Sequence, residues 1–153
     1  MQHSHLTGLL VVLGVLALTT VLGWWWSRRD GRVRPVAGDD RPTASDGARP
    51  PQLATLGVPA GVVTLVQFSS AFCAPCRATS RVLAEVEGHV DGLHVVEVDA
   101  EQHLDEVRAL AIWRTPTVLV VDANGRITQR VSGVPASDEL IAALRPLLAE
   151  AAR

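Results

Sequence analysis

A stretch of 21 residues without a charged side chain, Leu6 to Trp26, lies near the start of the sequence. A helix needs about 20 predominantly apolar residues to cross the hydrocarbon core of a bilayer. The stretch ends in three consecutive tryptophans, and indole rings favour the interface between membrane and water. We therefore expect residues 6–26 to form one transmembrane helix, preceded by a short tail of residues 1–5.

A cleaved signal peptide is the alternative for this stretch. Signal peptides begin with positive charge, have a shorter apolar region and end in a cleavage site of small residues. Residues 1–5 contain no arginine, and the sequence VLGWWWS at the end of the stretch offers no such site. These features favour a helix that is retained as an anchor.

The charges beside the stretch predict its orientation. Only His3 and His5 precede it, whereas four arginines follow it closely, at positions 28, 29, 32 and 34. Arginine and lysine in short flanking segments favour the cytoplasmic side of the membrane. This predicts a single-pass protein of the cell membrane with its C-terminal part in the cytoplasm, and an extracytoplasmic domain is the alternative.

The rest of the chain divides into a linker and one domain. Residues 27–51 are rich in Arg, Asp, Gly and Pro and have no apolar period, so we expect a flexible linker. Residues 52–150 have a globular composition and are numerous enough for one small hydrophobic core. The net charge of −2 and the lack of a basic patch with interleaved aromatics argue against nucleic acid as a partner.

Strand and helix patterns alternate along this domain. The continuous apolar run 62–69 is typical of a strand buried on both faces, and 93–98 and 117–121 are further strands. Helical spacing follows the first strand up to about Gly88 and recurs over 104–111. The order β-α-β-α-β-β-α predicts an α/β domain with a small mixed central sheet and helices on both faces.

The C-terminal end of the domain carries a hairpin and a helix. Asn124-Gly125 predicts a turn that pairs residues 126–131 antiparallel to the third strand, which adds an antiparallel edge to the sheet. Ser137 is the expected N-cap of the last helix. Pro146 lies inside that helix and should kink or shorten it.

The chain has two cysteines, Cys73 and Cys76, at the point where the first strand gives way to a helix. The unpaired N–H groups and the positive dipole end of a helix N-terminus stabilise a thiolate. A thiolate is the attacking species in thiol–disulfide exchange. The spacing therefore predicts a reactive pair in which Cys73 attacks and Cys76, one helical turn later, resolves the mixed disulfide.

Two other roles for the cysteines are possible. A static disulfide would close a very short loop and would restrain little of the unfolded chain. Together with His89 and His94 the cysteines also match a zinc-finger spacing, C-x2-C-x12-H-x4-H. A finger of that type needs a hairpin around its cysteines and a helix that carries both histidines, and this sequence predicts neither.

At this point the sequence resembles the thioredoxin family over about Leu53 to Leu148. The resemblance rests on LVQFSSAFCAPC at residues 65–76, VEVDAE at 96–101 and RTPTVLVVDANGR at 114–126, with Gly133 before the last helix. It implies a thioredoxin-like fold and an enzyme, a protein-disulfide reductase or thiol–disulfide oxidoreductase. A non-catalytic thioredoxin-fold module that binds partners or senses redox state is the rival hypothesis.

The resemblance also implies roles for particular residues. Cys73 and Cys76 would be catalytic, Pro116 would follow a cis peptide bond, and the substrate-binding residues would be Phe72, Ala74, Pro75, Thr115 and Pro116. No cofactor or metal beyond the redox-active disulfide would be needed. The partners would be protein thiols and disulfides, together with a reductase or a membrane electron carrier as external reductant.

Three positions depart from the family pattern. Phe72 replaces the usual Trp, Ala74-Pro75 replaces Gly-Pro, and Gln67 stands where a buried Asp is often found. In the family that Asp is thought to help move the proton of the second cysteine. An amide cannot exchange a proton in this way, so water or a carboxylate placed elsewhere would have to serve.

Overall fold

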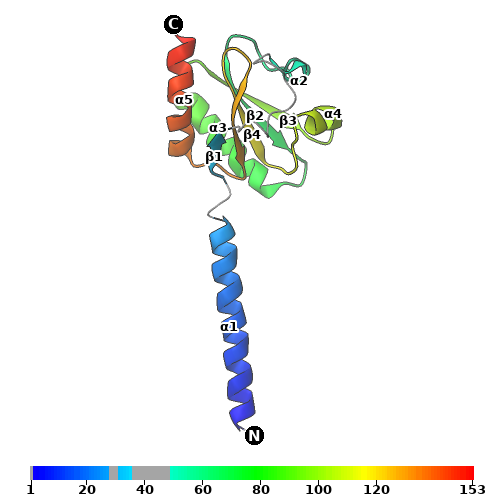
Figure 1. Ribbon diagram of the computed structural model, residues 1–153, viewed down its shortest axis with the longest axis vertical. Helices are drawn as coiled ribbons and strands as arrows, with labels where there is room; N and C mark the ends of the chain where they lie inside the picture. The colour runs from blue at the N-terminus through cyan, green and yellow to red at the C-terminus, as the bar shows by residue number, and fades with distance from the viewer. Residues whose placement is uncertain (1, 28–30, 36–48) are drawn as a thin grey trace. The chain divides into compact units, whose positions relative to one another are not determined.

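The computed structural model describes residues 2–27, 31–35 and 49–153 (Figure 1). The chain separates into two compact units, Met1–Asp30 and Gly31–Arg153. Each unit is described by itself.

The first unit contains a single long helix, α1 (Gln2–Ser27). The predicted segment 6–26 is thus helical, and the helix extends beyond it at both ends. Among the residues that the structure describes, no helix is long and apolar enough to cross a membrane.

The second unit is built on a five-stranded mixed sheet of order β1-β5-β4-β2-β3. The strands are β1 (Val33–Pro35), β2 (Val63–Ser69), β3 (Leu93–Asp99), β4 (Thr117–Val121) and β5 (Ile127–Ser132). Strands β2 and β3 pair in parallel, and the other neighbours pair antiparallel. The mixed sheet predicted from the alternating pattern is confirmed.

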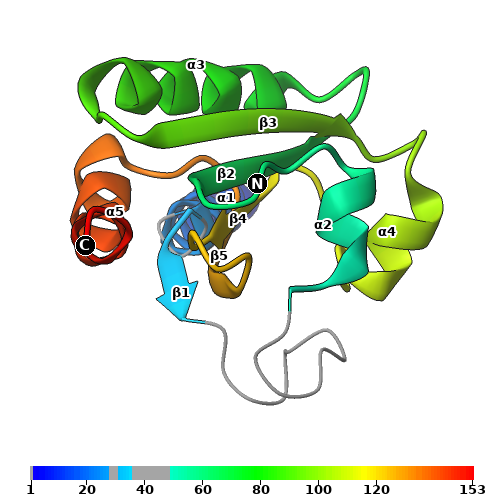
Figure 2. The same ribbon diagram turned by 90° about the horizontal axis from the view of Figure 1, so that it is seen from above.

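Helices cover both faces of this sheet, as predicted (Figure 2). They are α2 (Pro51–Thr55), α3 (Ala74–His89), α4 (Leu104–Ala109) and α5 (Ser137–Ala151). One buried cluster joins Leu53 of α2 and Val107 of α4 to the sheet, and a second joins Leu83 of α3 and Leu144 of α5 to its other face. Strand β2 contributes to both clusters, which explains its continuous apolar run.

Strand β1 is the main difference from the sequence prediction, because it lies inside the segment 27–51 expected to be a linker. Val33 pairs with Val131 of β5 and packs against the core cluster under α5. The backbone N–H of Gly31 donates to Ser132 O at 2.6 Å, and that of Val33 donates to Glu139 Oε1 at 3.0 Å. The hairpin strand β5 is therefore covered by β1 and is not the edge of the sheet.

Helix α5 differs from the prediction at its start and in its length. Ala136 is the N-cap, and Ser137 is the first helical residue. The helix continues past Pro146 to Ala151. The buried side chains of Leu140 and Leu144 hold it against the sheet, and tertiary packing of this kind outweighs the local cost of a proline.

Candidate functional site

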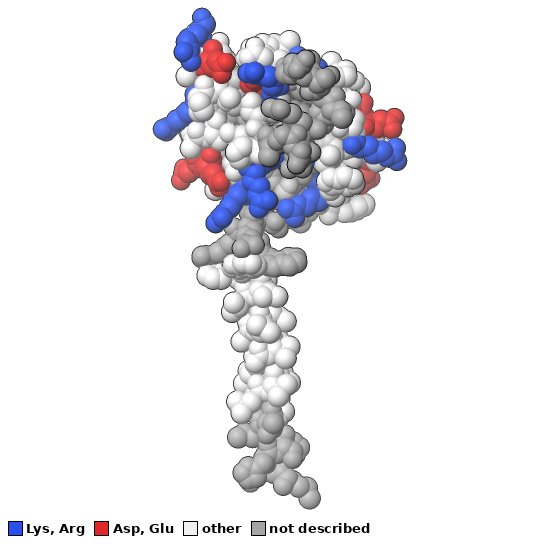
Figure 3. Space-filling view, viewed as in Figure 1, with Lys and Arg blue, Asp and Glu red and all other residues white. Residues whose placement is uncertain are grey.

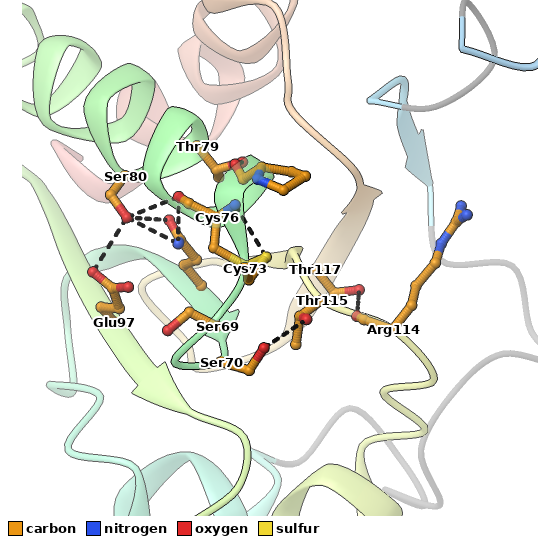
Figure 4. Close-up of a disulfide and its surroundings, with 12 residues drawn as sticks. Ser69, Ser70, Cys73, Cys76, Thr79, Ser80, Glu97, Arg114, Thr115 and Thr117 are labelled. Atoms are coloured by element: carbon orange, nitrogen blue, oxygen red, sulfur yellow. Dashed lines mark hydrogen bonds between the residues drawn. A yellow bond between two sulfur atoms is a disulfide. The ribbon is translucent and has the colours of Figure 1, made fainter.

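The two cysteines form a disulfide at the N-terminus of α3 (Figure 4). The S–S distance is 1.98 Å, and the two Cα atoms are 5.2 Å apart. Cys73 is the N-cap residue of the helix, and its sulfur accepts a hydrogen bond from the backbone N–H of Cys76 at 3.1 Å. The same N–H also donates to Cys73 O at 3.2 Å. A backbone N–H at the start of the helix thus points at this sulfur, a geometry that stabilises a thiolate after reduction.

Exposure distinguishes the two cysteines. Cys73 is half-buried, whereas Cys76 is only 2% exposed and faces the core. Ala74 and Pro75, between them, are exposed. An incoming disulfide therefore meets the sulfur of Cys73 first.

The Thr115–Pro116 segment is connected to the cysteine turn by hydrogen bonds. The peptide bond between the two residues is cis, as the resemblance implied. The hydroxyl oxygens of Thr115 and Ser70 are 3.3 Å apart, and Ser70 O accepts from the backbone N–H of Cys73 at 3.2 Å. Thr115 is half-buried and Pro116 is buried, so Thr115 is the more accessible of the two.

Two aromatic side chains near these segments in sequence are almost fully exposed. Phe72 precedes the first cysteine and is 99% exposed, and Trp113 precedes the Thr115–Pro116 segment and is 90% exposed. Large apolar side chains in full contact with water are a mark of interaction surfaces when they gather. Sequence analysis did not single out Trp113, although its place two residues before Thr115 was a usable signal.

Gln67 lies in β2 beneath the first turn of α3 and is 1% exposed. Its Nε2 donates to Cys76 O at 3.1 Å and to Ser80 Oγ at 3.0 Å. The Ser80 hydroxyl in turn lies 3.3 Å from Glu97 Oε2 (Figure 4). Sequence analysis missed Ser80 and Glu97, because the link depends on the register that places Glu97 of β3 beside Gln67 of β2.

The histidines of the zinc-finger spacing have other contacts. His89 Nδ1 lies 2.7 Å from Glu85 O, and His94 Nδ1 lies 3.7 Å from Glu87 Oε1. Among the residues that the structure describes, no group of three or more His, Cys, Asp or Glu is arranged to hold a metal ion. The sulfurs of Cys73 and Cys76 are bonded to each other.

The side chain of Arg130 in β5 holds the loop that leads to Thr115. The guanidinium of Arg130 donates to Leu110 O and to Ala111 O, both at 2.7 Å. A small cleft of about 190 Å³ lies beside this loop and is lined by Ala111, Trp113, Arg114, Thr117, Arg130 and Ser132. Arg130 thus fixes the backbone that carries both Trp113 and Thr115.

Comparison with known proteins matches this domain to one family. The family model described as Thioredoxin matches residues 59–146, which include both cysteines and the cis-proline. The thioredoxin of Alicyclobacillus acidocaldarius is 31% identical over 85 residues, covering 55% of this chain and 80% of that protein. The thioredoxin of Chlamydia caviae is 27% identical over 79 residues, covering 52% of this chain and 76% of that protein.

Solved structures show the same fold. Thioredoxin-2 of the malaria parasite superposes with a TM-score of 0.52 at 19% identity, over 56% of this chain and 82% of that one. The Fasciola hepatica thioredoxin superposes with a TM-score of 0.51 at 18% identity, over 62% of this chain and 86% of that one.

Proposed function

The chain belongs to the thioredoxin family, and we propose that it is a membrane-tethered thiol–disulfide oxidoreductase that reduces or exchanges disulfides in protein substrates. The family match and the Cys73–Cys76 pair establish the oxidoreductase activity. Thioredoxins use their dithiol without a cofactor, and the family implies protein disulfides as substrates and a separate reductant. The tether, the roles of individual residues and the direction of exchange are our proposals.

The reaction assigns different tasks to the two sulfurs. The thiolate of Cys73 attacks one sulfur of a substrate disulfide and forms a mixed disulfide, and the other substrate sulfur leaves as a thiolate. Cys76 then attacks the sulfur of Cys73, and the second substrate sulfur leaves. The substrate gains two electrons, the pair becomes a disulfide, and an external reductant returns it to the dithiol.

One observation carries this assignment. Cys73 is half-buried and accepts an N–H at the start of α3, whereas Cys76 is 2% exposed and lies in the first turn. The first position suits an attacking thiolate that must be reached from outside. The second suits a thiol that reacts only with its neighbour.

We assign substrate docking to the residues around Cys73. Phe72, Ala74 and Pro75 are exposed, and they present an apolar surface beside the attacking sulfur. Thr115 and Pro116 would offer backbone groups to an extended substrate segment, and Thr115 is joined to the cysteine turn through Ser70.

Insulin reduction tests the exchange reaction. With dithiothreitol as reductant the protein should accelerate the precipitation of insulin chains, and Cys73→Ser should abolish the acceleration. Cys76→Ser should instead accumulate mixed disulfides with substrate, visible as adducts in non-reducing mass spectrometry. Partner binding that both variants retain, with no acceleration by the unmodified protein, would favour a non-catalytic binding or redox-sensing module.

The membrane tether is supported by the sequence of residues 6–26, which contains no charged side chain. Described apolar side chains of α1, such as Leu16 and Val21, are exposed, so α1 offers an apolar surface within its own unit. The arginines that follow the stretch favour a domain on the cytoplasmic side of the membrane. The cytoplasm is a reducing compartment, so the cysteine pair would act there as a reductase. An extracytoplasmic domain would draw its electrons across the membrane.

Topology can be measured by labelling. Ser45→Cys in a Cys73→Ser/Cys76→Ser background places a single thiol in the segment after α1. In intact cells a reagent that cannot cross membranes should leave this thiol unmodified if the domain is cytoplasmic. Modification would place the domain outside, and release of the protein by alkaline carbonate would contradict the tether itself.

A further inference from the structure

The backbone of Cys76 is held on both sides of its Cα atom. On one side its N–H donates to Cys73 O at 3.2 Å and lies 3.1 Å from Cys73 Sγ. On the other side its carbonyl oxygen accepts from Gln67 Nε2 at 3.1 Å and from the Ser80 hydroxyl at 3.0 Å (Figure 4). Both peptide groups of the resolving cysteine are thus fixed, so rotation about its Cα–Cβ bond is the main freedom left to the reduced thiol.

The hydrogen bonds to the carbonyl oxygen connect the first turn of α3 to the centre of the sheet. Gln67 lies in β2 and is 1% exposed. Cys76 O can only accept, so the Nε2 donor of the amide must face it. The second N–H of this group points at Ser80 Oγ at 3.0 Å. A buried amide with both donors used has a single orientation, and it holds the carbonyl of Cys76 in one place.

The position of Cys76 matters for the second step of the exchange. In the first step Cys73 meets a substrate by diffusion, whereas in the second step Cys76 attacks a sulfur of its own chain. An intramolecular step is favoured by the effective concentration of one group at the other, which rises when both are held close to the reactive geometry. Backbone freedom that Cys76 has already lost in the folded dithiol is not lost again when the disulfide forms.

We propose that Gln67 is a positioning residue for the resolving step, which by holding the carbonyl of Cys76 raises the effective concentration of this thiol at the sulfur of Cys73. The Ser80 hydroxyl acts with it on the same oxygen. A higher effective concentration favours the disulfide over the dithiol, so Gln67 makes the pair a stronger reductant of its substrates. This proposal rests on the exchange reaction proposed above.

A redox equilibrium separates positioning from general stabilisation of the fold. Only the difference between the oxidised and the reduced protein enters such an equilibrium. A side chain that stabilised both states equally would leave it unchanged. If Gln67 positions Cys76, Gln67→Leu should lower the free energy of unfolding of the oxidised protein more than that of the reduced protein, because the reduced turn can relax.

Equilibrium with glutathione measures the effect on the full-length protein. The dithiol and one glutathione disulfide give the protein disulfide and two glutathione thiols, so two electrons and two protons pass to glutathione. Acid quenching, alkylation and mass spectrometry report the oxidised fraction over a series of glutathione ratios. Gln67→Leu should lower the equilibrium constant about 3- to 10-fold, the net effect of about one hydrogen bond.

Thr64→Val is the matched control for loss of a buried hydrogen bond in the same strand. Thr64 is fully buried in β2 and donates to Val62 O at 3.1 Å, at the end of the strand opposite the cysteine turn. This substitution should lower stability and leave the glutathione equilibrium unchanged. A shift as large as that of Gln67→Leu would mean that the equilibrium reports stability alone.

Ser80 provides a second variant if Gln67→Leu does not fold. Ser80→Ala keeps the bond from Gln67 to Cys76 O but removes the hydroxyl, so it should lower the equilibrium constant by a smaller factor, about 2- to 3-fold. Ser80→Thr keeps a hydroxyl at this place and should restore the constant. Loss of the same size in both Ser80 variants would contradict the role of the hydroxyl.

Kinetics with an aromatic disulfide, dithiobis(nitrobenzoate), assigns the effect to one step. Attack by Cys73 on this probe releases one coloured thiolate and attack by Cys76 releases the second, so stopped-flow absorbance reports two phases. Gln67→Leu should slow the second phase about 3- to 10-fold and change the first by less than about 2-fold.

An equilibrium constant that Gln67→Leu leaves unchanged or raises, or a second phase of unchanged rate, would overturn the proposal. If the reduced, unmodified protein released no coloured thiolate at all, the exchange reaction itself would be contradicted. The two failures are therefore distinguishable.

Discussion

Cys73 and Cys76 are three residues apart, yet their surroundings differ in ways that the chemistry requires. Cys73 is half-buried at the N-terminus of a helix, where its sulfur accepts a backbone N–H, and Cys76 is buried. The sequence motif predicted the pair and its place at the start of a helix. The supporting contacts of Ser80 and Glu97 could not be predicted in the same way, because they depend on strand register and on one helical turn.

Gln67 should stabilise the first turn of α3 as well as orient Ser80. Gln67→Leu keeps the volume of a side chain that is 1% exposed but removes its hydrogen bonds to Cys76 O and Ser80 Oγ. We expect the free energy of unfolding of the oxidised protein to fall by about 1 to 2 kcal/mol, measured by urea denaturation. Gln102→Leu, which removes one exposed hydrogen bond to Asp99, should cost less than about 0.5 kcal/mol. Equal losses in both variants would contradict the role of Gln67.

Gly31 has a backbone conformation that only glycine adopts easily. Its φ is 85°, and a methyl group on its Cα would overlap the carbonyl oxygen of Val134. Gly61 has a similar φ of 79° but no atom within 4 Å of the same position. Gly61→Ala should therefore cost about 1 kcal/mol of stability from the left-handed backbone alone, and Gly31→Ala about 2 kcal/mol. Thermal and urea unfolding of the two variants, side by side, would measure the difference.

At the level of whole elements, periodicity predicted the strands and helices that carry strong apolar patterns. Strands β2, β3 and β4 lie within a residue of their predicted ranges, because each has a run of apolar residues that the sheet buries. Strand β1 escaped prediction because it is three residues long and only Val33 faces the core. Its partner is β5, about a hundred residues further along the chain, and no local pattern reveals such a pairing.

The loop between α4 and β4 depends on one residue of β5. Arg130 is half-buried and donates to two carbonyl oxygens of this loop at 2.7 Å. Arg130→Met keeps the aliphatic stem but removes both bonds, so stability should fall by about 2 kcal/mol and amide exchange should accelerate over residues 110–115. Arg108→Met, which removes an exposed ion pair with Asp105, should change stability by less than about 0.5 kcal/mol. Unchanged exchange in the Arg130 variant would mean that packing alone fixes the loop.

For the molecule as a whole, the division into two units predicts that the exchange chemistry is independent of α1. Gly31–Arg153 forms a compact unit, and every group assigned to the reaction lies on α3, the loop before it, strand β2 or the loop before β4. A protein that begins at Gly31 should therefore reduce insulin as fast as the full chain. Loss of activity on this truncation would show that α1 contributes to the site.

A second truncation, beginning at Arg49, tests whether β1 belongs to the domain. It removes the three residue pairs between β1 and β5 and the bond from Val33 N–H to Glu139, so we expect about 2 kcal/mol less stability than in the protein that begins at Gly31. It also leaves β5 as an uncovered edge strand, which should raise self-association in light scattering. Gly31→Ala should cost no more than this truncation, because β1 can detach rather than accept the overlap. If the two truncated proteins are equally stable, residues 31–48 act only as a connection.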